Sequence, residues 1–159
     1  MYKRILVPLD GSSMAEFVLE HVRPFAQAFN TEIILLEVLV EPNEAFATHD
    51  SPLAPSPFVR RQKADANAYL KTLCAKLEGE GMRVSYLVRE GGVPETILDV
   101  ADFMEVDAIA MSTHGHSLTR LFLLGSVTYQ VVRRSPLPVL VVHPDSIRPP
   151  RERTESQGG

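Results

Sequence analysis

A segment of small and polar residues late in the chain has the composition of a phosphate-binding loop. Ser112–Ser126 contains glycine at Gly115 and Gly125. The apolar run Ala108–Met111 before it is typical of a buried strand, and Val127–Arg134 after it is typical of a helix. In α/β proteins such a loop directs free backbone N–H groups and the positive end of the helix dipole at one point. The chemistry that this segment indicates is the binding of a nucleotide phosphate.

Length and composition indicate one soluble globular domain. The chain has 159 residues, 45% of them hydrophobic and 23% charged. Its formal net charge of −4 offers no general attraction to nucleic acid or to an anionic membrane, so local geometry has to hold any phosphate. Met1–Arg4 leads straight into a strand-like segment, and no run approaches the ~20 apolar residues of a membrane span. We therefore expect a cytoplasmic protein with neither a nucleic-acid nor a membrane partner.

Segments typical of strands alternate with segments typical of helices. The predicted strands are Ile5–Leu9, Glu32–Val40, Arg83–Arg89, Ala108–Met111 and Val139–Val142. The predicted helices are Met14–Asn30, Val59–Glu80, Val93–Met104 and Val127–Arg134. This alternation predicts an α/β fold: a single doubly wound domain, residues 1–144, with a parallel sheet and helices on both faces. Residues 145–159 are polar and rich in proline, and are predicted to be a disordered tail.

Several local patterns sharpen these predictions. Ser13 and Glu16 fit a capping box at the start of the first helix, and Pro24 should kink or split that helix. Its apolar face is predicted to be Phe17, Val18, His21, Val22, Phe25 and Phe29. The apolar stripe of the second helix is predicted to be Ala64, Ala68, Leu70, Leu73, Cys74 and Leu77, with Cys74, the single cysteine, in a core role. Glu41–Pro57, with four prolines, predicts a long loop that could cover a neighbouring site.

The carboxyl ends of the strands should bring the polar residues together. Ligands of doubly wound folds bind there, where the strand order reverses. If the first and fourth strands are neighbours, Asp10 faces the Ser112–Ser126 loop, and its carboxylate could accept hydrogen bonds from a ribose diol. Gly115 and Gly125 would let the backbone approach a phosphate closely, and backbone near Val38 could pair with an adenine edge.

The charged and imidazole side chains of the loop leave alternatives open. Arg120 could contact a phosphate or could be a solvated loop charge. His114 and His116 have no third ligand at a useful spacing, so we predict no metal site made of protein side chains. Neither a nucleophile elbow nor a lysine-bearing P-loop is present. We therefore predict no catalytic residues, and slow ATP hydrolysis at most.

Four segments of the chain resemble the universal stress protein family. They are Ile5–Ser12, Leu36–Val38, the motif Ser112-Thr113-His114-Gly115 followed after nine residues by Gly125-Ser126, and Ser135–Val142. The motif is similar to the family's Gly-x2-Gly-x9-Gly-Ser/Thr pattern. The resemblance implies the strand order 3-2-1-4-5, a homodimer through the last strand, Val139–Val142, and ATP or another adenine nucleotide as the ligand, with any Mg²⁺ held mainly by the phosphates. The candidate nucleotide-binding residues are then Pro8, Leu9, Asp10, Ser12, Val38, Met111, Ser112, His114, Gly115, His116, Arg120, Gly125, Ser126 and Val127.

Two departures from the family pattern keep other functions open. Ser112 replaces the first glycine of the motif, so its side chain could bond to a ribose or crowd the pocket. His116 stands where the family often has arginine. A neutral imidazole attracts a phosphate less strongly than the arginine guanidinium does. We expect an ATP-binding regulatory stress-response protein. The alternatives are a nucleotide-free dimeric interaction module and a slow ATPase, and the sequence leaves ATP, AMP and cyclic nucleotides undistinguished.

Overall fold

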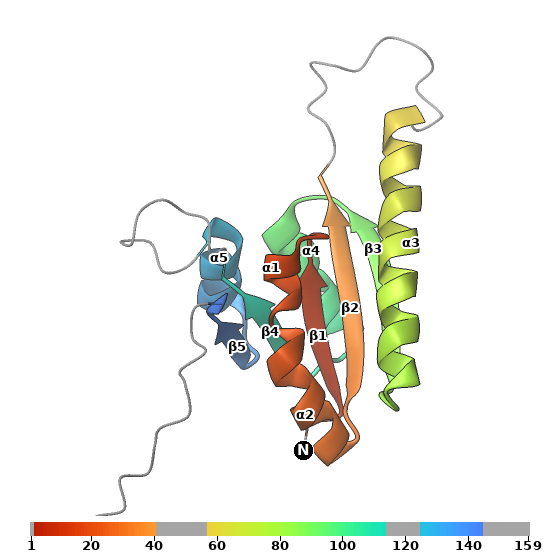
Figure 1. The fold of residues 1–159 in the computed structure, drawn as a ribbon. Coiled ribbons are helices and arrows are strands. Elements are labelled where there is room, and N and C mark those ends of the chain that lie inside the picture. The colour runs from red at the N-terminus through yellow and green to blue at the C-terminus, as the bar shows by residue number, and fades with distance from the viewer. Residues whose placement is uncertain (1, 41–56, 114–124, 145–159) are drawn as a thin grey trace, which may run out of the picture.

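The structure is a computed structural model that describes residues 2–40, 57–113 and 125–144. Its strands and helices alternate along the chain (Figure 1). In chain order they are β1 (Arg4–Leu9), α1 (Ser13–Glu16), α2 (Leu19–Phe29), β2 (Glu32–Leu39), α3 (Pro57–Gly79), β3 (Val84–Glu90), α4 (Val93–Phe103), β4 (Ala108–Ser112), α5 (Ser126–Arg134) and β5 (Val139–Val142). The predicted loop, apart from Pro57, and the predicted tail lie outside the described residues.

Five parallel strands form one sheet in the order β3-β2-β1-β4-β5. The predicted α/β fold and strand order are confirmed. β1 lies at the centre, and its Leu6 pairs with Ile34 of β2 on one side and with Ile109 of β4 on the other. The chain thus builds the sheet outward from β1 in both directions, and the order reverses between β1 and β4. Such a reversal leaves a crevice at the carboxyl ends of these two strands.

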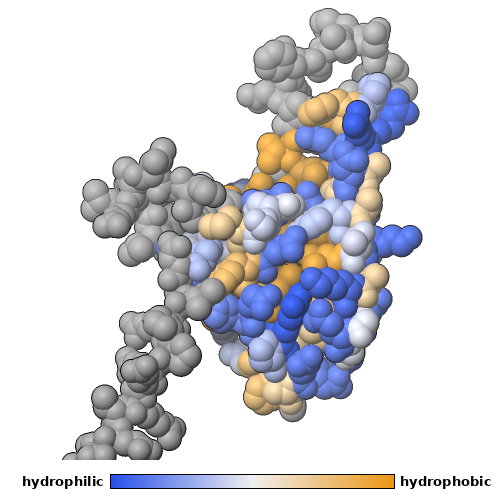
Figure 2. Space-filling view, viewed as in Figure 1, coloured by the Kyte–Doolittle hydropathy of each residue, from blue (hydrophilic) through white to orange (hydrophobic). Residues whose placement is uncertain are grey.

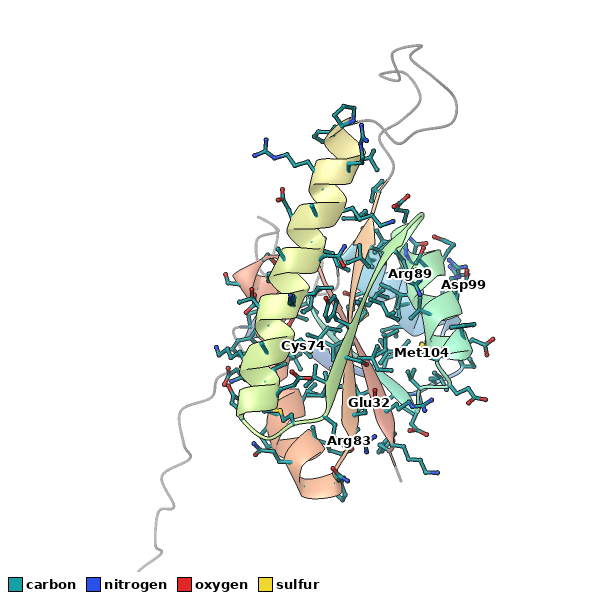
Figure 3. The ribbon with its side chains drawn as sticks, turned by 90° about the vertical axis from the view of Figure 1, so that its right-hand side faces the viewer. Glu32, Cys74, Arg83, Arg89, Asp99 and Met104 are labelled. Carbon is teal, nitrogen blue, oxygen red and sulfur yellow. The ribbon has the colours of Figure 1, made fainter. Side chains whose placement is uncertain are left out.

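Helices cover both faces of the sheet. Val7 and Leu35 pack with α2 and α3 on one face, whereas Leu6 and Ile34 pack with α4 and α5 on the other. Because adjacent residues of β1 and β2 enter different cores, both strands are continuous apolar runs in the sequence. Cys74 is buried between α3 and the sheet, with its Sγ 3.7 Å from the Val84 carbonyl oxygen (Figure 3). Its predicted core role is confirmed.

The first helix is capped by Ser12, and the predicted capping box of Ser13 and Glu16 is wrong. The Ser12 hydroxyl accepts a hydrogen bond from the Ala15 amide at 3.1 Å, and Ser12 has the extended backbone of an N-cap (φ −87°, ψ 148°). The reason lies in Asp10, whose carboxylate accepts a hydrogen bond from the Ser12 amide at 2.9 Å. That turn makes Ser12 the N-cap residue, so Ser13 is the first residue of the helix.

The predicted helix Met14–Asn30 is divided, but not at Pro24. α1 and α2 separate at Phe17 and Val18, where hydrogen bonds to the third preceding residue tighten the turn. α2 then runs through Pro24 to its end. Proline cannot donate to the carbonyl of Glu20, but both residues are exposed, so water can take the place of the missing donor.

The buried faces of α2 and α3 differ in part from the prediction. Four residues expected on these faces are exposed: His21, Phe29, Ala64 and Ala68. Leu19 and Ala26 are buried in α2, and Ala66 is buried in α3. The break before α2 changes the phase of its helical repeat. Alanine gives too weak an apolar signal to fix the phase of α3 from sequence.

Candidate functional site

A pocket of about 260 Å³ opens at the carboxyl ends of β1, β2 and β4, where the strand order reverses. Strands β1, β2 and β4 and helices α1, α4 and α5 all contribute to it. Its lining residues are Pro8, Leu9, Asp10, Ala15, Leu36, Val38, Val40, Val93, Ile97, Met111, Ser112, Val127 and Thr128. Hydrophobic side chains are exposed at this end of the molecule, over the end of β2 (Figure 2). The crevice expected from the topology is therefore a real hollow.

The structure brings half of the predicted site residues into this one pocket. Those that line it are Pro8, Leu9, Asp10, Val38, Met111, Ser112 and Val127. Ser12, Gly125 and Ser126 are not lining residues, although Ser12 bonds to Asp10 and the other two begin α5. The remaining candidates, His114, Gly115, His116 and Arg120, lie outside the described residues.

The lining residues that come from helices were missed because the strand-end rule concerns only strands. Val93 and Ile97 come from successive turns of α4, which packs beneath the pocket. Thr128 comes from the first turn of α5, and Ala15 comes from α1. The helical spacing of Val93 and Ile97 was a usable signal, since i and i+4 residues share one helix face.

The interior of the pocket is apolar. Leu36 and Ile97 are fully buried, and Met111 is 5% exposed. Val38 lies on the same face of β2 as Leu36. Side chains of this kind favour a flat apolar or heteroaromatic group, which loses little by leaving water.

Asp10 is the acidic group of the pocket, and a turn holds its carboxylate. Its Oδ1 accepts hydrogen bonds from the Ser12 amide at 2.9 Å and from the Ser12 hydroxyl at 2.5 Å. Asp10 itself is exposed at the rim. An exposed carboxylate whose orientation is already fixed can accept further hydrogen bonds from a ligand.

Ser112 and Thr128 are hydroxyl residues of the wall. Ser112 Oγ donates to the carbonyl oxygen of Ala15 at 3.2 Å. Thr128, which is 2% exposed, places its Oγ1 3.5 Å from the carbonyl oxygen of Ser112. The end of β4 is thus linked to both α1 and α5.

The N-terminus of α5 lies at the same end of the sheet, and Val127 and Thr128 of its first turn line the pocket. Gly125 is the N-cap residue, and as a glycine it has no side chain that could accept a hydrogen bond from the first-turn amides. The first main-chain bond of the helix runs from the Tyr129 amide to the Gly125 carbonyl at 2.9 Å. The amides of the first turn precede the helical hydrogen-bond pattern, and together with the helix dipole they favour an anion.

Two further carboxyl groups, those of Glu16 and Glu37, lie near the same strand ends, on the side of the sheet that α3 covers. The Tyr69 hydroxyl donates to Glu16 Oε1 at 2.9 Å, and burial together with this bond raises the pKa of Tyr69. Burial, and then the charge of Asp10, raise the pKa of Glu37. Glu37 Oε2 is buried and has no hydrogen-bond partner among the described residues. Among the described residues, the carboxyl groups of Asp10, Glu16 and Glu37 therefore lie near one another at this end of the sheet.

Two absences hold within residues 2–40, 57–113 and 125–144. No group of three or more His, Cys, Asp or Glu side chains there is arranged to hold a metal ion. None of the helices in those ranges has both the length and the apolar character needed to cross a membrane.

Fold and pocket together define a class of protein: a doubly wound α/β domain with a ligand pocket at the topological switch point. The sequence pattern of the universal stress protein family matches residues 1–143. The universal stress protein MJ0577 of Methanocaldococcus jannaschii is 32% identical over an alignment that covers 89% of this chain and 95% of that protein. The chain belongs to the universal stress protein family.

Solved structures agree with this assignment. A structure of MJ0577 superposes with a TM-score of 0.77 at 34% identity, covering 92% of this chain and 99% of its own. A universal stress protein in complex with cAMP gives a TM-score of 0.65 at 23% identity, covering 89% and 97%. A universal stress protein of Archaeoglobus fulgidus in complex with dAMP gives 0.62 at 19%, covering 88% and 97%. At these last two identities the likeness shows the shared fold.

Proposed function

We propose that the pocket binds an adenine nucleotide, ATP in the first instance, and that the protein is a nucleotide-binding regulator of the stress response. One observation carries the proposal: an apolar pocket lies at the switch point with a carboxylate, Asp10, and the N-terminal turn of α5 at its edge. The cAMP and dAMP complexes of proteins with this fold support an adenine nucleotide as the ligand.

The three parts of a nucleotide match three parts of the site. The base would lie among Val38, Ile97 and Met111, where contact with water is lost at little cost. The ribose hydroxyls would donate to Asp10. The phosphates would meet the first-turn amides of the α5 N-terminus beginning at Gly125 and Ser126, and any Mg²⁺ would be held mainly by the phosphates.

Binding, and not rapid turnover, is the activity that we propose. Efficient phosphoryl transfer depends on fixed cations beside the transferred group. Among the described residues that line the pocket, none is lysine or arginine. Nucleotide binding would therefore act by changing what the protein presents to its partners.

Calorimetric titration with ATP tests the proposal. We expect the wild-type protein to bind ATP and Gly125→Val to lose binding, because a branched side chain would stand where the phosphates approach. Gly79→Val is the matched control, since a Cβ at Gly79 meets nothing within 4 Å at the far end of α3. Absence of heat with ATP, AMP and cAMP at millimolar concentration would reject the proposal.

We also propose that the protein is a cytoplasmic homodimer that pairs through β5. β5 lies at the edge of the sheet and pairs only with β4 among the described strands. Nearby apolar side chains are exposed: Leu140 by 48%, Val132 by 42% and Tyr129 by 53%. An uncovered edge strand with exposed apolar side chains favours association.

Light scattering coupled to size-exclusion chromatography tests the dimer. Leu140→Asp should convert a dimer to a monomer, because it places a charge in the proposed contact. Phe103→Asp is the control, since Phe103 is 79% exposed at the end of α4 and lies outside β5. A wild-type protein that elutes as a monomer at micromolar concentration would contradict the assembly but not the nucleotide site.

A further inference from the structure

One hydrogen-bonded chain connects the polar residues of the pocket. Ser112 Oγ donates to the Ala15 carbonyl at 3.2 Å, and the Ala15 amide donates to Ser12 Oγ at 3.1 Å. Ser12 Oγ in turn donates to Asp10 Oδ1 at 2.5 Å. The chain therefore runs from the end of β4, through α1, to the carboxylate that we assign to the ribose.

The helix in the middle of this chain is held mainly by hydrogen bonds, which include one from the Tyr69 hydroxyl of α3 to Glu16 Oε1 at 2.9 Å. α1 is four residues long, and none of its residues is buried. A helix that buries no side chain gains little from hydrophobic packing, and an isolated turn of helix is unstable in water. The hydrogen bonds that α1 makes with Ser12, Ser112 and Tyr69 therefore matter more here than in a packed helix.

Ser112 itself is well placed to act as an anchor. It is the last residue of β4, and in the sheet it pairs with Val142 of β5. Thr128 of α5 lies 3.5 Å from its carbonyl oxygen. The position of Ser112 is thus fixed by the sheet, whereas α1 depends on the bonds that it receives.

We propose that Ser112 is a positioning residue for nucleotide recognition: its hydroxyl fixes α1 through the Ala15 carbonyl and so sets the orientation of the Asp10 carboxylate. This inference rests on the proposed function. It gives the serine that replaces the motif glycine a definite role, in which the hydroxyl is directed to the protein and does not plug the pocket. The consequence is selectivity for a ribose over a 2′-deoxyribose, because only a correctly oriented carboxylate can accept from both hydroxyls of the diol.

Paired titrations with ATP and 2′-deoxy-ATP test the selectivity. Ser112→Ala should weaken ATP about fivefold, the effect of one lost hydrogen bond, and 2′-deoxy-ATP by less than about twofold. Ser135→Ala is the matched control. Its hydroxyl also bonds to backbone, donating to the Leu137 carbonyl at 3.0 Å and accepting from the Leu137 amide at 3.1 Å, but it does not line the pocket. Unchanged affinity, tighter binding, or equal loss for both nucleotides would overturn the inference.

A double-mutant cycle with Asp10→Asn separates positioning from a general loss of structure. If Ser112 acts through Asp10, Ser112→Ala should change ATP affinity by less than about twofold in the Asp10→Asn background. A serine that only stabilised the fold would give the same fivefold loss in both backgrounds. That result would overturn the inference and leave the proposed nucleotide site intact.

Hydrogen exchange of the ligand-free protein supplies a readout that needs no nucleotide. The amides of Ser12 and Ala15 donate to Asp10 and Ser12, so in Ser112→Ala they should exchange about fivefold faster than in wild type. Ser135→Ala should leave them unchanged. If wild type binds no nucleotide, the proposed function fails. Exchange rates that do not respond to Ser112→Ala overturn the anchoring role whether or not nucleotide binds.

Discussion

The two ends of the sheet treat polar groups in opposite ways. At the amino end, charged residues neutralise one another: Glu32 Oε2 lies 3.5 Å from Arg4 Nε and 3.8 Å from Arg83 Nη2 (Figure 3). There too, Asp107 Oδ2 accepts hydrogen bonds from the amides of Lys3 and Arg4 at 2.6 and 2.9 Å. These contacts join β1 to β2, β3 and the start of β4. These ion pairs and hydrogen bonds stabilise the fold at this end of the sheet.

At the carboxyl end the same strands surround a hollow. Polar side chains there, Asp10, Ser12 and Ser112, bond mostly to backbone and to one another and shape the α1 turn. Glu37 keeps a buried oxygen without a hydrogen-bond partner among the described residues. Parallel strands direct all their carboxyl ends to one edge, and the reversal of strand order between β1 and β4 lies at that edge, where we place the ligand.

The largest effect that we predict concerns the wall of the hollow. Ile97→Ala should lower the free energy of unfolding by about 3 kcal/mol, because Ile97 is fully buried between α4 and the sheet. Urea unfolding followed by circular dichroism measures it. Phe103→Ala, on the same helix but 79% exposed, should change stability by less than about 0.5 kcal/mol. Equal effects would mean that the carboxyl end is not a firmly packed site.

The next effect concerns the amino end. Asp107→Ala removes the acceptor of two amides and should cost about 1.5 kcal/mol, with no change in ATP affinity. The amides of Arg4 and Lys3 lower the pKa of Asp107. A lowered pKa in the folded state means that this stabilisation is present above the ordinary pKa of about 4 and is lost as pH falls through the folded value.

The free energy of unfolding, measured between pH 2 and pH 7, tests whether this stabilisation is lost on acidification. The wild-type protein should lose more stability on acidification than Asp107→Ala does. Asp102→Ala, an exposed aspartate at the end of α4, is the control and should follow the wild-type profile. A loss of ATP affinity in Asp107→Ala would show that the two ends of the sheet are not independent.

A smaller loss of stability should follow from removing the hydrogen bond that joins α3 to α1 at the carboxyl end of the sheet. Tyr69→Phe removes the hydroxyl that donates to Glu16 and joins α3 to α1, at a cost of about 1 kcal/mol. Tyr2→Phe is the control, because Tyr2 is 39% exposed at the other end of the sheet. Thermal unfolding distinguishes the two variants. Similar melting temperatures would mean that α1 does not depend on the bond from α3.

The sequence was sufficient for the sheet because each strand has a strong local signal. Ile33–Leu36 is a continuous apolar run, and in the structure all of its residues are buried. Strand order could not be derived from such runs, because strand pairing joins residues far apart in the sequence. The predicted order came from the family resemblance. Two predictions from local rules were wrong. The first helix divides at the tight turn of Phe17 and Val18 and not at Pro24, and the hydrogen bond from the Ser12 amide to Asp10 makes Ser12, not Ser13, the N-cap.

The candidate site was predictable where strand ends form it. Asp10, Val38 and Ser112 follow from the rule that parallel strands end at one edge. Ala15 and Thr128 did not, because their place in the pocket depends on how α1 and α5 dock against β4. The Ser112–Ala15 hydrogen bond joins residues 97 apart and has no local signature in the sequence.

The smallest effect that we predict is a shift in melting temperature, which should be upward for a substitution at Glu37 and downward for one at Glu32, near the two ends of β2. The raised pKa of Glu37 means that the folded state binds more protons than the unfolded state between the ordinary and the folded pKa, so stability falls as pH rises through that window. At neutral pH Glu37→Gln should therefore raise the melting temperature, by an amount that solvent screening keeps to about 1–2 °C. Glu32→Gln at the other end of the strand loses two arginine partners and should lower it by a similar amount. If both variants shift the melting temperature in the same direction, charge at the carboxyl end is compensated as it is at the amino end, and the two ends do not differ as we infer.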